Sequence, residues 1–102
     1  MQLEYYSPQI LTSQIKQILG KYFDLKKVKV FYFGSRVTGN SNKRSDIDLG
    51  LQGQEKISSK IKFELMDDLD NLPVLYKIDL VDFSQTSPSF QKEALKKVEM
   101  IN

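Results

Sequence analysis

Length, composition and charge exclude several classes of protein. The chain has 102 residues, 15 of them basic and 13 acidic, a net charge of +2, and neither cysteine nor histidine. A chain of this length forms one domain, and its near-balanced charge gives no indication of direct nucleic-acid binding. It can build neither disulfides, thiolate zinc sites nor an imidazole base. We expect residues 1–102 to be a single cytoplasmic domain without membrane contact, because neither a basic-then-apolar leader nor a membrane-length apolar run is present.

The first half of the chain predicts a helix followed by a buried strand. Ser7 followed by a proline is typical of a helix start, and apolar residues then recur at helical spacing over residues 8–22. Residues 28–33 are mostly β-branched or aromatic, which predicts a strand buried on both faces. The polar residues 34–45 leave room for one short helical turn near Arg36.

The second half predicts two further strands and two further helices. Residues 46–52 are expected to form the second strand, and a helix capped by Ser58 follows. Residues 76–83 are expected to form the third strand, and a Ser-Pro start at Ser87 begins a last helix that continues to Ile101. The order αβ(α)βαβα predicts an α/β (α+β) fold in which helices flank a small three-stranded mixed sheet.

Two aspartates separated by one residue open the second predicted strand. Side chains at i and i+2 of a strand project from the same face, so Asp46 and Asp48 are expected to stand side by side, about 6.6 Å apart along the backbone. Carboxylates held this close repel each other unless a cation or a proton neutralises them. Oxygen-only ligands favour a hard cation such as Mg²⁺. The alternative is a pair of ordinary solvent-facing strand residues.

A Gly-Ser turn directly follows the first predicted strand. Gly34 and Ser35 can present backbone N–H groups and a hydroxyl to phosphate oxygens. Taken alone, the same pair is better explained as a turn that caps a short helix. Joined to the aspartate pair, it predicts a nucleotide-binding, metal-dependent phosphoryl-transfer site.

A third carboxylate, Asp79, lies between apolar residues in the middle of the third predicted strand. Burial of an unpaired acid is costly, so Asp79 is expected to be solvated, paired or functional. If the third strand lies beside the second, Asp79 can join Asp46 and Asp48 in holding two cations, as two-metal sites require. It can then also accept a proton from an attacking hydroxyl. Asp82 is a competing candidate, but it is expected to point to the other face.

Basic residues accompany the Gly-Ser turn. Arg36, Lys43 and Arg44 can steer a triphosphate into the cleft, and the alternative is a solvated loop that happens to be basic. Arg36 is assigned to nucleotide binding together with Gly34 and Ser35.

The spacing of these residues resembles a known family signature. Gly34-Ser35, ten intervening residues and Asp46-Ile47-Asp48 match the signature of the DNA polymerase β-like nucleotidyltransferases. The fuller pattern, Gly-Ser-Arg-x-x-Gly before Ser-Asp-Ile-Asp-Leu, is most similar to the minimal nucleotidyltransferase (MNT) antitoxins, which are typically paired with a HEPN-domain ribonuclease toxin. The order of elements and Asp79 fit the same family, so the resemblance covers nearly the whole chain.

The resemblance implies a nucleotidyltransferase core, an activity and a partner. Gly34 and Ser35 would contact the β- and γ-phosphates of ATP, while Asp46, Asp48 and Asp79 would form the Mg²⁺ site. Active members transfer AMP from ATP to a tyrosine hydroxyl of the HEPN toxin, which silences the toxin. Larger relatives carry a helical domain that completes the site, so a partner or a second copy of the chain is expected to supply the acceptor surface.

Two other functions stay open at this point. A non-catalytic antitoxin would use the same fold to bind and block its toxin, and an aminoglycoside-type enzyme would transfer the nucleotide to a small molecule. The complete set of motif residues argues against the first, and the absence of a second domain for the acceptor argues against the second.

Overall fold

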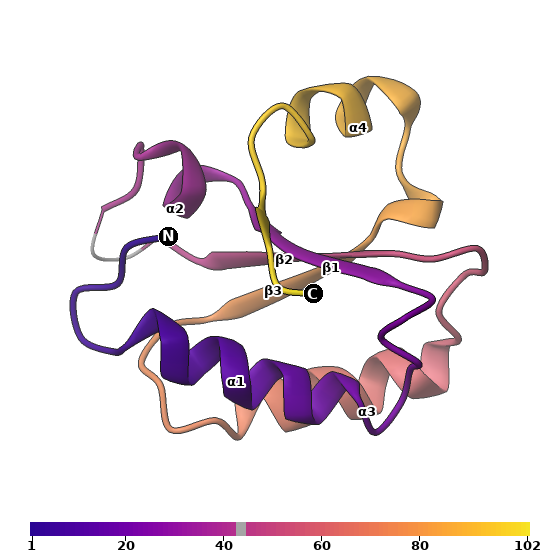
Figure 1. The fold of residues 1–102 in the computed structure, drawn as a ribbon, viewed down its shortest axis with the longest axis horizontal. Helices are drawn as coiled ribbons and strands as arrows, with labels where there is room; N and C mark the ends of the chain where they lie inside the picture. Colours follow the sequence, from indigo (N-terminus) through magenta and orange to yellow (C-terminus); the bar gives the residue numbers. More distant parts are fainter. Residues whose placement is uncertain (43–44) are drawn as a thin grey trace.

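The fold is a four-stranded sheet with helices on both faces (Figure 1). The computed structural model describes residues 1–42 and 45–102. The strands are β1 (Lys29–Phe33), β2 (Ile47–Gln52), β3 (Ile78–Asp82) and β4 (Glu99–Met100). The helices are α1 (Pro8–Leu19), α2 (Ser35–Thr38), α3 (Ser59–Asp70) and α4 (Pro88–Ala94), with a 3-10 turn, η1 (Phe83–Gln85), before α4.

The sheet is mixed, and its strand order is β3-β2-β1-β4. β1 runs antiparallel to β2 and to β4, whereas β2 and β3 are parallel. Both the predicted fold class and the predicted position of the third strand beside the second are confirmed. Because of these directions, the end of β1 meets the starts of β2 and β3 at one end of the sheet.

Serine residues fix the starts of the three longer helices. Ser7, Ser58 and Ser87 are the N-caps of α1, α3 and α4, and each accepts a hydrogen bond from the backbone N–H three residues further on. α1 and α4 also have proline at the first helical position, where its missing N–H costs nothing. These starts confirm the sequence prediction.

Two predicted helices end earlier than the sequence pattern indicated. α1 ends at Leu19 rather than at Tyr22, because Gly20 caps the helix and turns follow it. The last helix ends at Ala94, and the segment predicted to continue it to Ile101 turns back and adds the edge strand β4 to β1.

The prediction of a three-stranded sheet was therefore wrong by one edge strand. The apolar residues of this last segment fit a helical period, but they contact opposite sides of the sheet. Val98 packs against the aromatic residues under α4, and Ile101 joins the core on the side of α1 and α3. Residues three apart lie on opposite faces of an extended segment, whereas they share a face in a helix.

The main hydrophobic core lies between the sheet and the layer formed by α1 and α3 (Figure 1). A smaller aromatic cluster of Phe31, Phe33 and Phe83 occupies the opposite face, where α4 covers it. The ring centroid of Phe83 lies 4.9 Å from that of Phe31 and 5.2 Å from that of Phe33, both in edge-on geometry. This second face is covered only in part, by α2 and α4, and it is the face that carries the predicted site.

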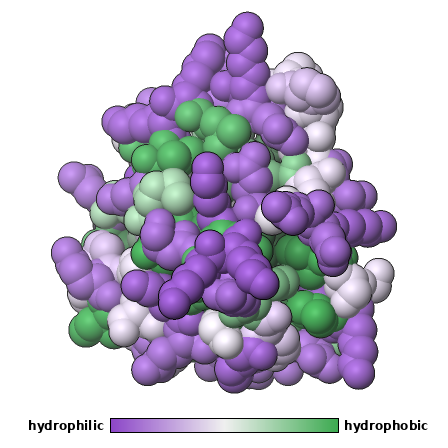
Figure 2. All heavy atoms as spheres, turned by 45° about the vertical axis from the view of Figure 1, so that its right-hand side comes forward, coloured by the Kyte–Doolittle hydropathy of each residue, from purple (hydrophilic) through white to green (hydrophobic). Residues whose placement is uncertain are grey.

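The surface in Figure 2 is largely hydrophilic, and hydrophobic side chains form small separate areas on it. Within residues 1–42 and 45–102, no helix is both long enough and apolar enough to cross a membrane.

Candidate functional site

The end of β1 and the starts of β2 and β3 bring the predicted acidic residues together. Asp48 of β2 is paired with Phe33 of β1 on one side and with Asp79 of β3 on the other. Residues directly opposite each other project from the same face of a sheet. Asp46 lies two residues before Asp48 and shares a hydrogen bond with Asp79. The three predicted carboxylates therefore converge on the face opposite α1 and α3.

The carboxylates are crowded enough to change one another's protonation. The hydrogen bond with Asp79 is the main cause that raises the pKa of Asp46, followed by partial burial and the charge of Asp79, while Lys77 acts in the opposite direction. Burial is the main cause that raises the pKa of Asp48, followed by the charges of Asp79 and Asp46. A bound cation can stabilise the ionised form of these acids, so that they no longer need to retain protons.

Gly34 brings the Gly-Ser turn into contact with this carboxylate cluster. Its φ of +79° lies in the left-handed region that favours glycine. A Cβ atom at this position would overlap the carboxylate of Asp48, so no other residue fits without a shift. Gly34 is the N-cap of α2 and Ser35 is its first residue, so the turn backbone borders the carboxylates as the sequence spacing predicted.

The structure commits Arg36 to contacts within the protein, which corrects its assignment to nucleotide binding. Its side chain is fully buried, and its guanidinium donates to the carbonyl oxygen of Ser45 and to the carboxylate of Glu4. These contacts occupy the groups that a phosphate would need. Lys43 and Arg44, the other two basic residues of the prediction, lie outside the described residues.

Asp82, the competing acid, points to the other face as predicted and has a local structural role. Its carboxylate accepts hydrogen bonds from the backbone N–H of Ile57 at 2.9 Å, the backbone N–H of Ser84 at 3.0 Å and the Ser84 hydroxyl at 2.7 Å. Burial alone would raise the pKa of Asp82, but these hydrogen bonds outweigh it and lower the pKa.

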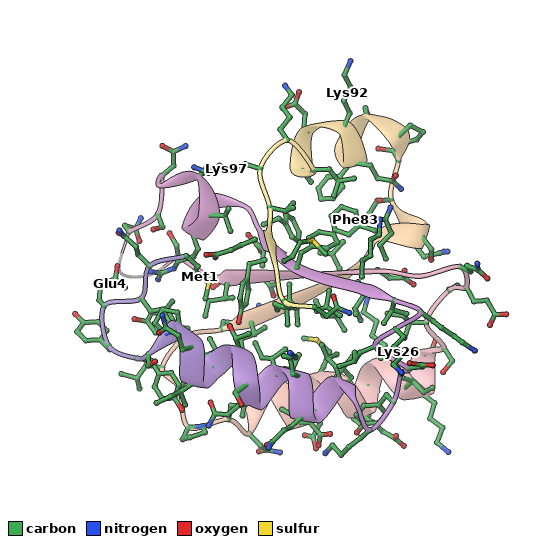
Figure 3. All side chains as sticks on the ribbon, viewed as in Figure 1. Met1, Glu4, Lys26, Phe83, Lys92 and Lys97 are labelled. Carbon is green, nitrogen blue, oxygen red and sulfur yellow. The ribbon has the colours of Figure 1, made fainter. Side chains whose placement is uncertain are left out.

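A pocket of about 390 Å³ opens beside the Gly-Ser turn, and its lining includes Phe33, Gly34, Thr38, Phe90, Lys96 and Lys97. Figure 3 shows Lys97 extending from the side of α4 toward α2. The two lysines are not predicted from the sequence, because only the reversal of the chain after α4 brings them to the pocket that Gly34 lines. No spacing signal in the sequence could have identified them.

A larger pocket of about 950 Å³ lies at the opposite end of the strands, where Lys26, Val28, Leu51 and Gly53 line it. None of the motif residues contributes to it. Its size therefore does not make it the functional site, and the smaller pocket beside Gly34 is the one that adjoins the carboxylates.

The carboxylates have the chemistry expected of part of a cation site. Their oxygen atoms suit a hard cation such as Mg²⁺, which in proteins is often bound by one or two carboxylates together with substrate phosphates. In the described part of the chain, no group of three or more acidic side chains is arranged to hold a metal ion by itself. Asp46 and Asp48 thus fit Mg²⁺ when a nucleotide provides further oxygen ligands.

Comparison with protein families gives a match over most of the chain. Residues 13–102 match the family model described as "Polymerase beta, Nucleotidyltransferase". A probable protein adenylyltransferase, MntA of Haemophilus influenzae, is 32% identical over 72 residues, which amount to 71% of this chain and 62% of the relative. The match thus spans less than two thirds of that relative's length.

Comparison with solved structures gives the same fold. A chain from a toxin-antitoxin complex with AMP-PNP superposes with a TM-score of 0.72 and 21% identity, over 89% of this chain and 72% of that one. A chain from the complex of a tri-AMPylated Shewanella oneidensis HEPN toxin with its MNT antitoxin gives a TM-score of 0.69 and 19% identity, over 92% and 71% of the two chains.

Proposed function

Because this chain belongs to the polymerase β nucleotidyltransferase family, we propose that it is an antitoxin that transfers AMP from ATP to a tyrosine hydroxyl of a partner HEPN toxin. The family match agrees with the resemblance carried by the Gly-Ser turn and the aspartate pair. One observation carries the proposal: Gly34 borders Asp48, and Asp79 faces Asp48 from the neighbouring strand. A turn suited to phosphate thus lies beside a carboxylate cluster suited to a cation.

The similar proteins support the choice of AMP and of a HEPN partner. The Haemophilus influenzae relative is described as a probable protein adenylyltransferase, and a structure with the same fold contains an AMPylated HEPN toxin bound to its antitoxin. ATP and Mg²⁺ are both available in the cytoplasm, where we expect the reaction to occur.

The turn and the aspartate pair would bind the nucleotide. Gly34 and Ser35 would contact the β- and γ-phosphates through backbone N–H groups and the serine hydroxyl. Asp46 and Asp48, with Asp79 as the third acid of the site, would hold Mg²⁺ against the phosphate oxygens. When bound, Mg²⁺ neutralises charge on the triphosphate and polarises the phosphorus under attack.

Asp79 would act on the acceptor. Its carboxylate would accept the proton of the tyrosine hydroxyl, the tyrosine oxygen would form a bond to the α-phosphorus, and the bond from that phosphorus to the bridging oxygen would break in line. The products are AMP-tyrosine and pyrophosphate. Lys97, which lines the pocket beside Gly34, would neutralise part of the charge on the leaving pyrophosphate.

Transfer of label from α-³²P-ATP tests the proposal. The wild-type chain and its Asp46→Ala variant would be added with Mg²⁺ to a lysate of the native host, and labelled proteins would be separated and digested. We expect a labelled protein that carries AMP on tyrosine with the wild-type chain and none with the variant.

Asp70→Ala is the matched control, because Asp70 is an exposed acid at the end of α3, which packs on the face of the sheet opposite the carboxylate cluster. It should leave labelling unchanged. Absence of label with the wild-type chain, while the same partner protein still co-purifies with both forms, would favour an antitoxin that acts by binding alone. Label on a small molecule would favour an aminoglycoside-type enzyme that transfers the nucleotide to a small molecule.

A further inference from the structure

Arg36 is a buried cation whose hydrogen bonds are distributed over two parts of the chain. Its side chain has no exposed area. Nε and Nη2 donate to the carbonyl oxygen of Ser45 at 3.2 and 2.8 Å. Nη1 donates to both carboxylate oxygens of Glu4, at 2.8 and 3.2 Å, and more weakly to the carbonyl oxygen of Gln2 at 3.4 Å.

A guanidinium in this position requires a negative partner. Removal of one member of a buried ion pair leaves an uncompensated charge, which is far more costly than loss of an exposed pair. Glu4 is the only acid in an ion pair with Arg36 within the described residues. The hydrogen bond from Arg36 is also the main cause that lowers the pKa of Glu4, so the carboxylate is ionised at neutral pH.

The same cation joins both halves of the Gly-Ser and aspartate motif. Arg36 directly follows Ser35, and its fork holds the carbonyl of Ser45, which directly precedes Asp46. The link is short in sequence on both sides, so a rotation of the guanidinium would shift the backbone at Ser45 and with it the side chain of Asp46.

A tyrosine extends this network toward the third strand. The ring centroid of Tyr76 lies 4.8 Å from Cζ of Arg36, within cation–π range. The Tyr76 hydroxyl donates to Glu4 at 3.1 Å and accepts from the backbone N–H of Tyr5 at 2.9 Å. Tyr76 comes three residues before Asp79. Figure 3 shows Glu4 on the N-terminal segment, on the same side of the molecule as α2.

We propose that Glu4 is a positioning residue of the nucleotidyltransferase site, acting through Arg36 to hold Asp46 against the Gly34–Ser35 turn. This inference rests on the proposed function. Glu4 lies outside the motif, yet it would maintain the position in which Asp46 can bind a cation beside a nucleotide. Residues of this kind, which hold the residues that bind a metal, typically change metal affinity by about 10- to 100-fold when they are replaced.

Glu4→Gln tests this role, and Asp68→Asn is its matched control. Asp68 also accepts hydrogen bonds from a cation and a tyrosine hydroxyl, Lys21 at 3.0 Å and Tyr22 at 2.6 Å, and its exposed fraction of 27% is close to the 32% of Glu4. It lies on α3, on the other side of the sheet. A purely structural role of Glu4 should therefore leave Mn²⁺ binding unchanged in both folded variants, even though loss of the buried partner of Arg36 costs more stability than loss of the partner of the exposed Lys21.

The readout is binding of Mn²⁺ in the presence of α,β-methylene-ATP, measured by the electron paramagnetic resonance of free Mn²⁺ against a protein-free baseline, because the triphosphate of the analogue also binds Mn²⁺. This analogue cannot release pyrophosphate, so the measurement is independent of turnover. We expect Glu4→Gln to weaken Mn²⁺ binding at least tenfold, Asp68→Asn to change it by less than twofold, and urea unfolding to show that both variants are folded.

Unchanged Mn²⁺ binding by folded Glu4→Gln would overturn the positioning role while leaving the proposed function intact. Failure of the wild-type chain to bind Mn²⁺ with the analogue would overturn both. If Glu4→Gln does not fold, Tyr76→Phe gives the same test more mildly, because it keeps the ring over Arg36 and removes only the hydroxyl that donates to Glu4. It should weaken Mn²⁺ binding about threefold, and no change would overturn the proposal.

Discussion

Asp48 and Asp79 lie opposite each other on neighbouring parallel strands, on the face of the sheet that α1 and α3 leave uncovered. Burial and the charges of Asp79 and Asp46 all raise the pKa of Asp48. The arrangement therefore opposes the ionised form of Asp48 as long as no cation is bound, and a bound cation reverses this effect.

Replacement of Asp48 by asparagine should separate activity from stability. We expect AMP transfer to fall about 10³-fold, because a ligand of the cation is lost. The free energy of unfolding in EDTA should rise slightly, since one of the mutually repelling charges is removed. Label transfer and urea titrations measure the two effects. Full transfer by this variant would exclude Asp48 from the cation site.

Gly34→Ala should damage the site directly. Alanine at a φ of +79° is strained, and its Cβ would overlap the carboxylate of Asp48. We expect a loss of about 1–3 kcal/mol in the free energy of unfolding, together with loss of nucleotide binding. Gly39→Ala is the control, because Gly39 also has positive φ, at 86°, but a Cβ there would meet open space. It should cost stability and leave much of the nucleotide affinity.

Lys97→Ala should weaken the contact with the leaving pyrophosphate. We expect the ATP concentration for half-maximal transfer to rise by up to about fivefold, because an exposed charge contributes at most ~1 kcal/mol. Lys92→Ala is the control, since Lys92 points away from the body of the protein (Figure 3). Equal effects of the two variants would mean that only the overall charge matters.

The buried carboxylate of Asp82 should make stability depend on pH. Its folded pKa is lowered, so its stabilising contribution is complete above the unfolded pKa of about 3.9 and is lost as the pH falls through the folded pKa. Asp82→Asn places an amide against two backbone N–H donors, and we expect it to cost about 1–3 kcal/mol at pH 7. Urea titrations should show that the difference from wild type shrinks below about pH 4; a difference constant with pH would contradict this assignment.

The aromatic cluster should hold α4 over the site. Phe83 is fully buried against Phe31 and Phe33, so Phe83→Ala should lower the free energy of unfolding by about 3–5 kcal/mol. Phe63 is 76% exposed on α3, and its replacement by alanine should change stability by no more than about 0.5 kcal/mol. Urea unfolding measures the loss of stability in both variants. Similar losses in Phe83→Ala and Phe63→Ala would show that the aromatic cluster contributes little to stability.

The sequence predicted the features that local chemistry determines. Serine caps set the starts of α1, α3 and α4, and the i, i+2 spacing of Asp46 and Asp48 placed both acids on one face. The pairing of Asp79 with Asp48 followed from one assumption about strand order, which the structure confirms.

What the sequence did not predict depends on contacts between distant residues. The strand β4 has only two residues and exists because it pairs with β1, so no periodic pattern announces it. Arg36 was predicted to bind phosphate because its partner Glu4 is 32 residues away in the sequence. The burial of the Arg36 side chain depends on the folded N-terminal segment, which the local sequence does not indicate. Lys97 lines the pocket beside the Gly-Ser turn only because the chain reverses direction after α4.

One face of the sheet carries most of the hydrophobic core, and the other carries the candidate site. The main core lies on the side of α1 and α3, whereas the carboxylates and the pocket beside Gly34 lie on the other. Under the proposed function, exposed residues on this second face can therefore change with the acceptor at little cost to folding. On the face that bears α2 and α4, tolerance to substitution should accordingly be greatest at exposed positions outside the aromatic cluster of Phe31, Phe33 and Phe83.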